Sequence, residues 1–441
     1  MKGSARLLLA AILLSTGAYA TKVPIPVEGA SLNISVQVQP QFLINEASTP
    51  DGLNPSFDTF VRRTRLLVNG DINQNFSYLF QVDNANFGKF GNYTTPRAIV
   101  QDAWIGWAPT GVTGGTVFYI DAGILLIPIS RHMLTSTTNF ITADAQTDAF
   151  RFPGAAFQAF RDTGVQIRGW ALDKKLGWRG GVFEGYTPFL QPAAAAATAT
   201  NPACVAATPG TCITPKRYPA FRGFVNFQVI GSEEGVWVYG DYKWGKSPVV
   251  SVNVAGNYQA QAVRNGFGNL ADQRLLAFGA YVNLPMSEAA EFVGEGTLYL
   301  NGNGSSSANS GTGISASAGY RFGFIAPYVA YDYFQSTNCD DPGLTNTGGA
   351  ISQATCDGSN SRNIKGGLNF FFNKNANHLN IEFGVNHGQS AYGPSSVTVA
   401  SAGYVPLSLD PAPPATTRRA FSNALANPVF KSLLIHWNVL F

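Results

Sequence analysis

The chain has 441 residues and a formal net charge of +3, with 45% hydrophobic and only 12% charged residues. A typical soluble domain has about 25% charged residues, so the composition disfavours an ordinary soluble surface. Lysine and arginine do not cluster in the sequence, which gives no support for nucleic acid as a partner.

The first twenty residues are typical of a signal peptide. Lys2 and Arg6 flank the start of an apolar run from Leu7 to Leu14, and Ala18-Tyr19-Ala20 has the small-x-small pattern of a cleavage site. The apolar run is much shorter than the roughly 20 residues that a membrane helix needs. We therefore predict a signal peptide over residues 1–20 and a single domain over residues 21–441.

Apolar and polar residues alternate along much of the remaining chain, which is typical of β-strands with one apolar face. Sixteen segments show this pattern, each about as long as the 9–11 residues that a tilted strand needs to cross a bilayer. These segments are Leu32–Phe42, Thr59–Asp71, Phe76–Ala85, Ala98–Ala108, Thr116–Ile127, Phe160–Ala171, Leu176–Tyr186, Phe221–Ile230, Val249–Gln259, Arg274–Leu284, Glu291–Leu300, Gly313–Phe322, Ala326–Phe334, Asn363–Asn373, His378–Asn386 and Val429–Phe441.

The connections between these segments alternate between short and long. Short turns such as Asn73–Asn75 contrast with long connections such as Pro188–Arg217 and Thr337–Arg362, as in bacterial barrels with short periplasmic turns and long external loops. The segment Gly231–Lys246 is long where a short turn is expected. As an extra hairpin it would raise the number of strands from sixteen to eighteen.

The end of the chain gives the clearest alternation. Leu433, Ile435, Trp437, Val439 and Phe441 are all apolar, whereas the residues between them are mixed. One face of this strand therefore suits hydrocarbon and the other a wetter environment. We predict an all-β fold, a transmembrane antiparallel β-barrel most simply built from sixteen strands and surrounded by outer-membrane lipid. The terminal phenylalanine resembles the assembly signal of bacterial outer-membrane barrels.

The same parity sorts the charged side chains onto the inner face of the barrel. Arg or Lys on the lipid face costs roughly 2–4 kcal/mol at mid-bilayer, so this sorting is strongly constrained. The inward-facing charged residues are predicted to include Arg63, Arg65, Asp71, Asp83, Asp121, Asp162, Arg168, Arg222, Glu291, Glu295, Arg321, Asp332, Lys365, Glu382 and His436. A barrel of this size with such an interior is expected to hold water.

The four cysteines form two groups that are close in sequence, Cys204 with Cys212 and Cys339 with Cys356. Each group lies in a polar connection between predicted strands, which favours disulfides formed in the oxidising periplasm. Three pairings are possible in principle, and we predict the pairing of nearest neighbours. The spacing does not suit a metal site, and none is predicted.

The first third of the chain resembles the phosphate-selective porin O and P family. The resemblance is carried by Phe60–Gly70, Phe76–Asp83, Ala103–Trp107, Asp121–Ile124, Pro128, Leu134–Ser136 and Arg161–Gln166. It implies a sixteen-stranded barrel that is commonly a homotrimer, with the third external loop folded inward as a constriction. By position that loop is Pro128–Gln158, and its charged residues are Arg131, His132, Asp144, Asp148 and Arg151.

We predict passive diffusion of small polar or ionic solutes, with inorganic anions such as phosphate among the candidates. The residues expected to attract anions are Arg63, Arg65, Arg131, Arg151, Arg168 and Arg222, and the opposing acidic residues are Asp83, Asp121, Asp144 and Asp162. A competing interpretation is that each arginine forms a wall salt bridge that stiffens the barrel. Phosphate-specific members carry many basic pore residues, whereas this loop has two arginines, no lysine and two aspartates.

Two other functions remain open from the sequence. An enzyme inside the barrel would need a Ser or Thr nucleophile with a His base, but the four histidines form no recognisable catalytic pattern, and we predict neither catalysis nor a cofactor. A surface adhesin or receptor would act through the long loops, of which Gly388–Asn423 is the best candidate. Asp340, Asp341 and Asp357 are a weak calcium candidate.

Overall fold

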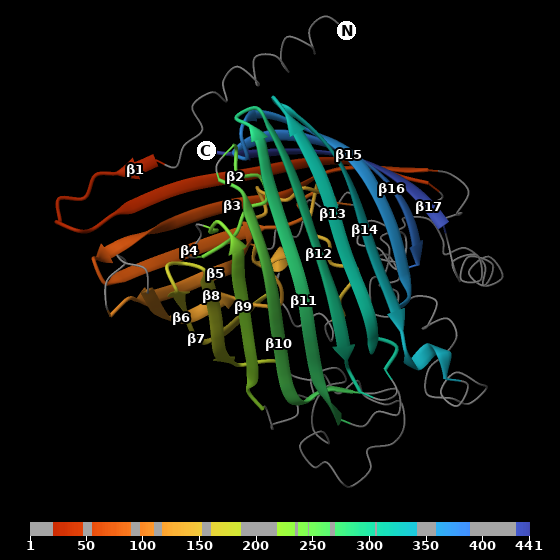
Figure 1. Ribbon diagram of the computed structural model, residues 1–441, viewed down its shortest axis with the longest axis horizontal. Helices are drawn as coiled ribbons and strands as arrows, with labels where there is room; N and C mark the ends of the chain where they lie inside the picture. Colours follow the sequence, from red (N-terminus) through yellow and green to blue (C-terminus); the bar gives the residue numbers. More distant parts are fainter. Residues whose placement is uncertain are drawn as a thin grey trace, which may run out of the picture.

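A computed structural model shows one large barrel of antiparallel strands (Figure 1). The structure describes residues 21–46, 55–89, 98–109, 117–151, 160–186, 218–233, 237–245, 247–264, 270–304, 307–341, 359–388 and 429–441. The predicted signal peptide and most of the long connections lie outside these residues. Among the described residues there is no helix long and apolar enough to span a membrane.

Sixteen strands of the described chain close into a ring in which every strand pairs with its neighbours in sequence. The last strand then pairs with the first of the ring, so that the sheet has no free edge. The strands are β2 (Leu32–Asn45), β3 (Ser56–Asn73), β4 (Phe76–Asn84), β5 (Ala98–Trp107), β6 (Val117–Leu126), β7 (Arg161–Ala171), β8 (Leu176–Phe183), β9 (Ala220–Ile230), β10 (Val249–Arg264), β11 (Leu270–Ser287), β12 (Ala290–Gly302), β13 (Gly311–Phe322), β14 (Ile325–Ser336), β15 (Ser361–Asn373), β16 (Asn377–Gly388) and β17 (Val429–Leu440).

The ring closes at a seam between β17 and β2. Leu440 lies opposite Gln37, and Phe441 exchanges two backbone hydrogen bonds with Val36. A three-residue strand, β1 (Thr21–Val23), pairs with the same edge of β2 just beyond this point. The edge of β2 is therefore covered first by the last residues of the chain and then by β1.

All sixteen predicted strands are confirmed, and the differences are confined to their ends. The largest are in β10 and β11, which continue to Arg264 and begin at Leu270, so that both are longer than the alternation indicates. The interpretation of Gly231–Lys246 as an extra hairpin is wrong. β9 and β10 pair directly, with Ile230 opposite Val250, and the residues between them leave the sheet.

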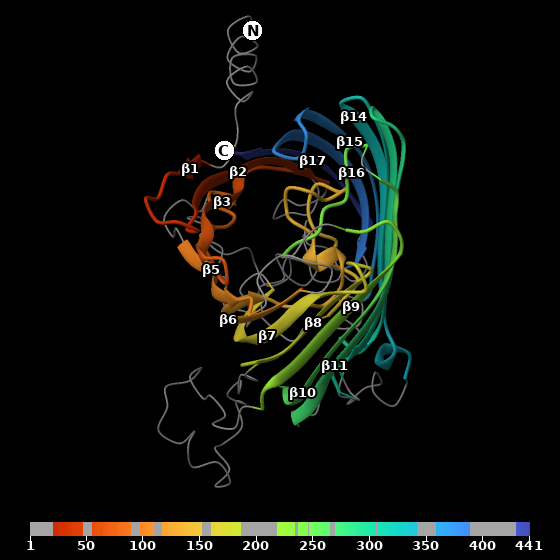
Figure 2. The ribbon, with the colours of Figure 1, turned by 60° about the vertical axis from the view of Figure 1, so that its left-hand side comes forward.

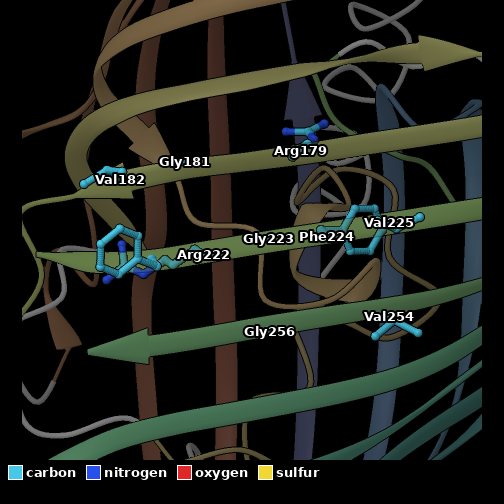
Figure 3. A pocket seen from close by; sticks show the side chains of 10 residues that line it. Arg179, Gly181, Val182, Arg222, Gly223, Phe224, Val225, Val254 and Gly256 are labelled. Atoms are coloured by element: carbon cyan, nitrogen blue, oxygen red, sulfur yellow. The ribbon is translucent and has the colours of Figure 1, made fainter. Parts of the chain in front are cut away.

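Side chains alternate between the two faces of the sheet as predicted. On β9, Phe221 and Val225 are 52% and 46% exposed on the outer face, whereas Arg222 between them is 3% exposed. Figure 3 shows this part of the wall, where Gly223 and Gly256 lie side by side on β9 and β10. The outer face is thus an apolar belt, and the polar and charged residues point into the lumen.

Candidate functional site: the constricted lumen

Residues 127–151, which follow β6 and which we call the inner loop, fold into the barrel (Figure 2). The loop contacts much of the inner wall. Thr137 accepts a hydrogen bond from Arg65 on β3 at 2.8 Å, and the carbonyl oxygen of Ile141 accepts one from Asn369 on β15 at 2.8 Å. Gln146 donates to backbone carbonyls of β13 and β14. The predicted inward fold of the third loop is therefore present in the described part, residues 128–151.

Ala143 and Asp144 place the inner loop across the closure of the ring. The amide of Ala143 donates to Glu382 on β16 at 3.4 Å, whereas Asp144 binds Arg63 on β3 at 2.7 Å. Leu43 on β2 and Leu434 on β17 form a buried apolar cluster with Ala143. The strands on both sides of the closure between β17 and β2 thus contact the same short stretch of the inner loop.

A second segment enters the lumen from the opposite end of the barrel. This segment is residues 231–248, which connect β9 to β10 and which we call the inner turn; residues 231–233, 237–245 and 247–248 are described. Because neighbouring strands are antiparallel, the connection after β9 lies at the other end from the connection after β6. Trp237 of the inner turn packs on Trp104 of β5 with ring centroids 4.4 Å apart.

The inner loop and the inner turn meet in the lumen through backbone hydrogen bonds. The amide of Tyr239 donates to the carbonyl of Leu134 at 2.8 Å, and the amide of Ser136 donates to the carbonyl of Tyr239 at 3.0 Å. The amide of Asp241 donates to the carbonyl of Asn139 at 3.2 Å. We call this contact the inner seam. The lumen is therefore crossed by two joined segments and not by one loop.

Arg131 is the centre of the inner seam. Its guanidinium lies 2.6 Å from Glu233 and 3.2 Å from Asp241, both on the inner turn, and 3.2 Å from Glu295 on β12. It also stacks on the ring of Tyr281, 3.4 Å from the centroid, and it is fully buried. A residue predicted to attract anions in the pore is thus enclosed by three carboxylates of its own chain.

The other predicted arginines and aspartates form ion pairs with one another. Arg65 lies 2.9 Å from Asp83, Arg168 lies 2.5 Å from Asp121, and Arg222 lies 2.7 Å from Asp162. With the pair between Arg63 and Asp144, all four predicted acidic residues bind a predicted arginine. Arg151 donates to backbone carbonyls of Asp148 and Ser359 and stacks on Phe334. This geometry favours the salt-bridge interpretation for most of the set.

Sequence reasoning missed several lumen residues that belong to this network. Arg62 shares Asp144 with Arg63 at 2.7 Å, and Arg161 lies 3.1 Å from Asp102. Glu233 and Asp241 were missed because the alternation assigned the inner turn to the sheet or to an ordinary connection. The available signal was the length of this connection, since the turn after β7 spans only residues 172–175.

The buried charges are distributed unevenly around the lumen. Among the described residues, strands β3 to β9 carry five buried arginines and three buried aspartates, whereas strands β10 to β17 carry two buried basic and four buried acidic residues. The first set is Arg63, Arg65, Arg168, Arg179, Arg222, Asp83, Asp102 and Asp121, and the second is Arg321, Lys365, Glu291, Glu295, Asp332 and Glu382. The two halves of the wall therefore differ in the sign of their buried formal charge.

The histidines have structural partners in the described residues. His132 lies 3.4 Å from Glu295, and His436 contacts Gln41 at 2.6 Å. Ser130 beside His132 accepts hydrogen bonds from Tyr299 and from the amide of Met133. The imidazole of His387 and all of Ser390 lie outside the described residues. No group of three or more His, Cys, Asp or Glu suited to a metal occurs in the described part.

Cys339 is disulfide-bonded. Cys204, Cys212 and Cys356 lie outside the described residues, so the predicted pairing of nearest neighbours stays a prediction. The long connections proposed for surface binding, and Asp357 of the calcium candidate, also lie outside the described residues.

Comparison of the sequence with protein-family models gives no match, and comparison with curated proteins gives none. Comparison with solved structures gives matches at low sequence identity. OmpF of Salmonella typhi, solved in a complex with daunomycin, has a TM-score of 0.54 at 12% identity, with 96% of this chain and 100% of that chain covered. The outer-membrane channel DcaP of Acinetobacter baumannii has a TM-score of 0.49 at 12% identity, with 94% and 99% covered.

At such identities the likeness concerns the fold. The chain has the closed antiparallel fold of the bacterial outer-membrane porins, and the outer membrane is the location that goes with this fold.

Proposed function

We propose that the chain is a non-enzymatic channel of the bacterial outer membrane, through which small polar solutes diffuse passively. One observation carries the proposal: a closed sheet presents apolar side chains to lipid and charged side chains to its lumen. On β9 these faces are represented by Val225 and Arg222, and the pattern recurs around the ring. A barrel with such an interior offers a hydrated route across the membrane.

Conductance of the purified protein in planar lipid bilayers tests this proposal. We expect stepwise current increases as single barrels insert, and no steps with protein that was unfolded by heating in detergent. Folded protein that inserts into the bilayer but carries no current would contradict a channel function.

The two walls of opposite sign support a preference for solutes that carry both charges or a strong dipole. A field of one sign is needed to concentrate ions of the other sign, and the buried charges do not provide one. Anion or phosphate preference is the finer part of the proposal, and it requires Arg63, Arg65, Arg151, Arg168 and Arg222 to outweigh the acidic residues around them. Reversal potentials under a KCl gradient, with and without phosphate, test it: a cation-preferring pore that is indifferent to phosphate would contradict it.

We also propose membership of the phosphate-selective porin family, a homotrimer, and removal of residues 1–20. Strand length supports the trimer, since β4 to β9 have 8–11 residues and β10 to β17 have 12–18. The part of the barrel wall that is built from short strands spans less of the hydrocarbon layer, so it suits contact with another subunit. Light scattering in detergent measures the oligomer, and mass spectrometry of the outer-membrane protein locates its first residue; a monomer or a retained leader would contradict these points.

A further inference from the structure

The inner seam joins two segments that the chain could otherwise place independently. The inner loop comes from one end of the barrel and the inner turn from the other, and they are held by backbone hydrogen bonds at Tyr239 and Asp241. The side chain of Asp241 also accepts a hydrogen bond from the amide of Ile141 at 2.9 Å. The position of the inner turn therefore depends on the inner loop.

Arg131 supplies most of the charge contacts of this seam. It binds Glu233 through two nitrogens, at 2.6 and 2.9 Å, and Asp241 through a third contact at 3.2 Å. It also donates to the carbonyl of Gly240 at 3.0 Å. Lys243 lies 3.1 Å from Glu233 on the same turn. Without Arg131, the carboxylates of Glu233 and Asp241 on the turn and of Glu295 on β12 would lose the cation of the inner loop that they share.

The two ends of the inner turn meet at one point of the sheet. Gly231 has φ +66°, and a Cβ there would lie 2.1 Å from the carbonyl oxygen of Pro248. The turn therefore leaves and rejoins the wall through a narrow base. Glycine permits the left-handed backbone that this base requires.

We propose that Arg131 is a positioning residue that holds the inner turn across the lumen, so that the loop and the turn together set the limiting cross-section. Loss of the seam lets the turn move toward its end of the barrel and widens the pore. This inference rests on the proposed channel function and adds a second constriction to it. It assigns Arg131 the role of a tie between the two segments and not that of an anion ligand.

A disulfide across the seam provides a direct test. A Cβ at Gly240 would lie 3.6 Å from the Cβ of Asn139, within the usual range for a disulfide. The pair Asn139→Cys with Gly240→Cys therefore locks the seam when oxidised. Single-channel conductance and the exclusion limit for polyethylene glycols are measured for wild type, for Arg131→Met, and for Arg131→Met combined with the cysteine pair, each oxidised and reduced. Wild type under the same reductant controls for the native cysteines, and each single cysteine variant controls for mispairing.

We expect Arg131→Met to raise conductance roughly twofold and to admit larger polymers, since both follow the open cross-section. The oxidised cysteine pair should restore wild-type values in the Arg131→Met background, and reduction should release them again. Wild-type values for Arg131→Met, or a wide pore that the oxidised pair fails to narrow, would overturn the inference. Absence of current from wild type would instead overturn the channel function.

A second variant tests the constriction without the substitution of Arg131, so that the result does not depend on buried carboxylates left without their cation. Replacement of residues 232–247 by Asn-Gly removes the inner turn, and β9 and β10 remain paired because Ile230 already lies opposite Val250. This variant should show the same wide pore as Arg131→Met. Unchanged conductance and exclusion limit in the turn-deletion variant would refute a constricting role of the turn.

Discussion

Arg63 on β3 and Asp144 on the inner loop form a buried ion pair, with Nη2 and Oδ1 2.7 Å apart. The same carboxylate binds Arg62 at 2.7 Å, so one loop residue compensates two wall cations. Burial alone would raise the pKa of Asp144, but the two guanidinium groups outweigh it and hold the pKa well below its usual range. Asp144 therefore stays ionised even in mild acid.

Asp144→Asn should make the pore more selective for anions. The substitution leaves Arg62 and Arg63 without their carboxylate, and the wall that already has an excess of arginine gains further positive potential. Breaking a buried pair from one side costs about 3–5 kcal/mol, so the barrel should also be less stable. The reversal potential under a KCl gradient measures the selectivity. Asp272→Asn, at an exposed ion pair with Arg274, is the control and should not change it; an unchanged reversal potential in Asp144→Asn would argue against this role.

Val225→Arg should destabilise the folded barrel by about 2–4 kcal/mol, because Val225 lies on the outer face of β9 and arginine is costly in hydrocarbon. Urea-dependent folding into lipid vesicles gives the free energy. Val225→Ala loses apolar area without adding charge and should have a smaller effect. Equal effects of the two substitutions would place this face of β9 outside the bilayer.

Gly313→Val should displace the inner loop without opening the ring. A Cβ at Gly313 on β13 would lie 1.5 Å from the carbonyl oxygen of Ala149, because the loop backbone passes directly over this strand. The loop must move to accept the side chain, so conductance should change while the circular dichroism of the β-sheet stays the same. Gly296→Val on the neighbouring strand β12, where the nearest atom is 3.9 Å away, is the matched control. A wild-type conductance in Gly313→Val would contradict this close approach.

The inner seam should be tighter at pH 5 than at pH 8. Burial, followed by the nearby charge of Glu295, raises the pKa of Asp241 to about 6. Burial alone would lower the pKa of His132, but its hydrogen bond to Glu295 and the charge of that residue raise it above the ordinary value. Both raised pKa values mean that the docked seam binds protons more tightly than the open one. This stabilisation of the docked seam is therefore complete below the ordinary pKa values of the two groups, and it is lost as the pH rises through their raised pKa values.

Conductance and its noise between pH 5 and pH 8 measure this dependence. The charged or titratable groups around Asp241 are Arg131, His132, Glu233, Lys243, Tyr281 and Glu295. We expect the wider, noisier current at the higher pH. Asp241→Asn keeps an oxygen that can accept from the amide of Ile141 but cannot titrate, so it should reduce the pH dependence. A pore that narrows as the pH rises would contradict the assigned sign.

The alternation of residues was sufficient to locate the wall. In β17 the apolar parity from Leu433 to Val439 faces outward and His436 is buried, because a period of two leaves each side chain only one face. Strand ends were less well determined. β11 continues to Ser287, where the inner parity is no longer buried: Asn283 is buried, whereas Ser287 is exposed.

The partners of the lumen charges could not be predicted in this way. Parity placed Arg63 and Asp83 inside the barrel, but Asp83 binds Arg65, and Arg63 instead binds a carboxylate 81 residues away on the inner loop. Such pairs depend on the path of the loop, which has no repeating pattern. The inner turn was misjudged for the same reason: Trp237 and Tyr239 look like strand residues, but they pack inside the lumen against Trp104 and Phe224.

The position of Ala143 and Asp144 has a consequence for the strength of the ring closure. These adjacent residues contact β16 and β3, on the two sides of the junction where the first and last strands meet. One short piece of loop thus ties together strands that lie at opposite ends of the sequence, in addition to the direct pairing of β17 with β2. A substitution in this stretch should therefore weaken the cohesion of the barrel itself as well as alter permeation.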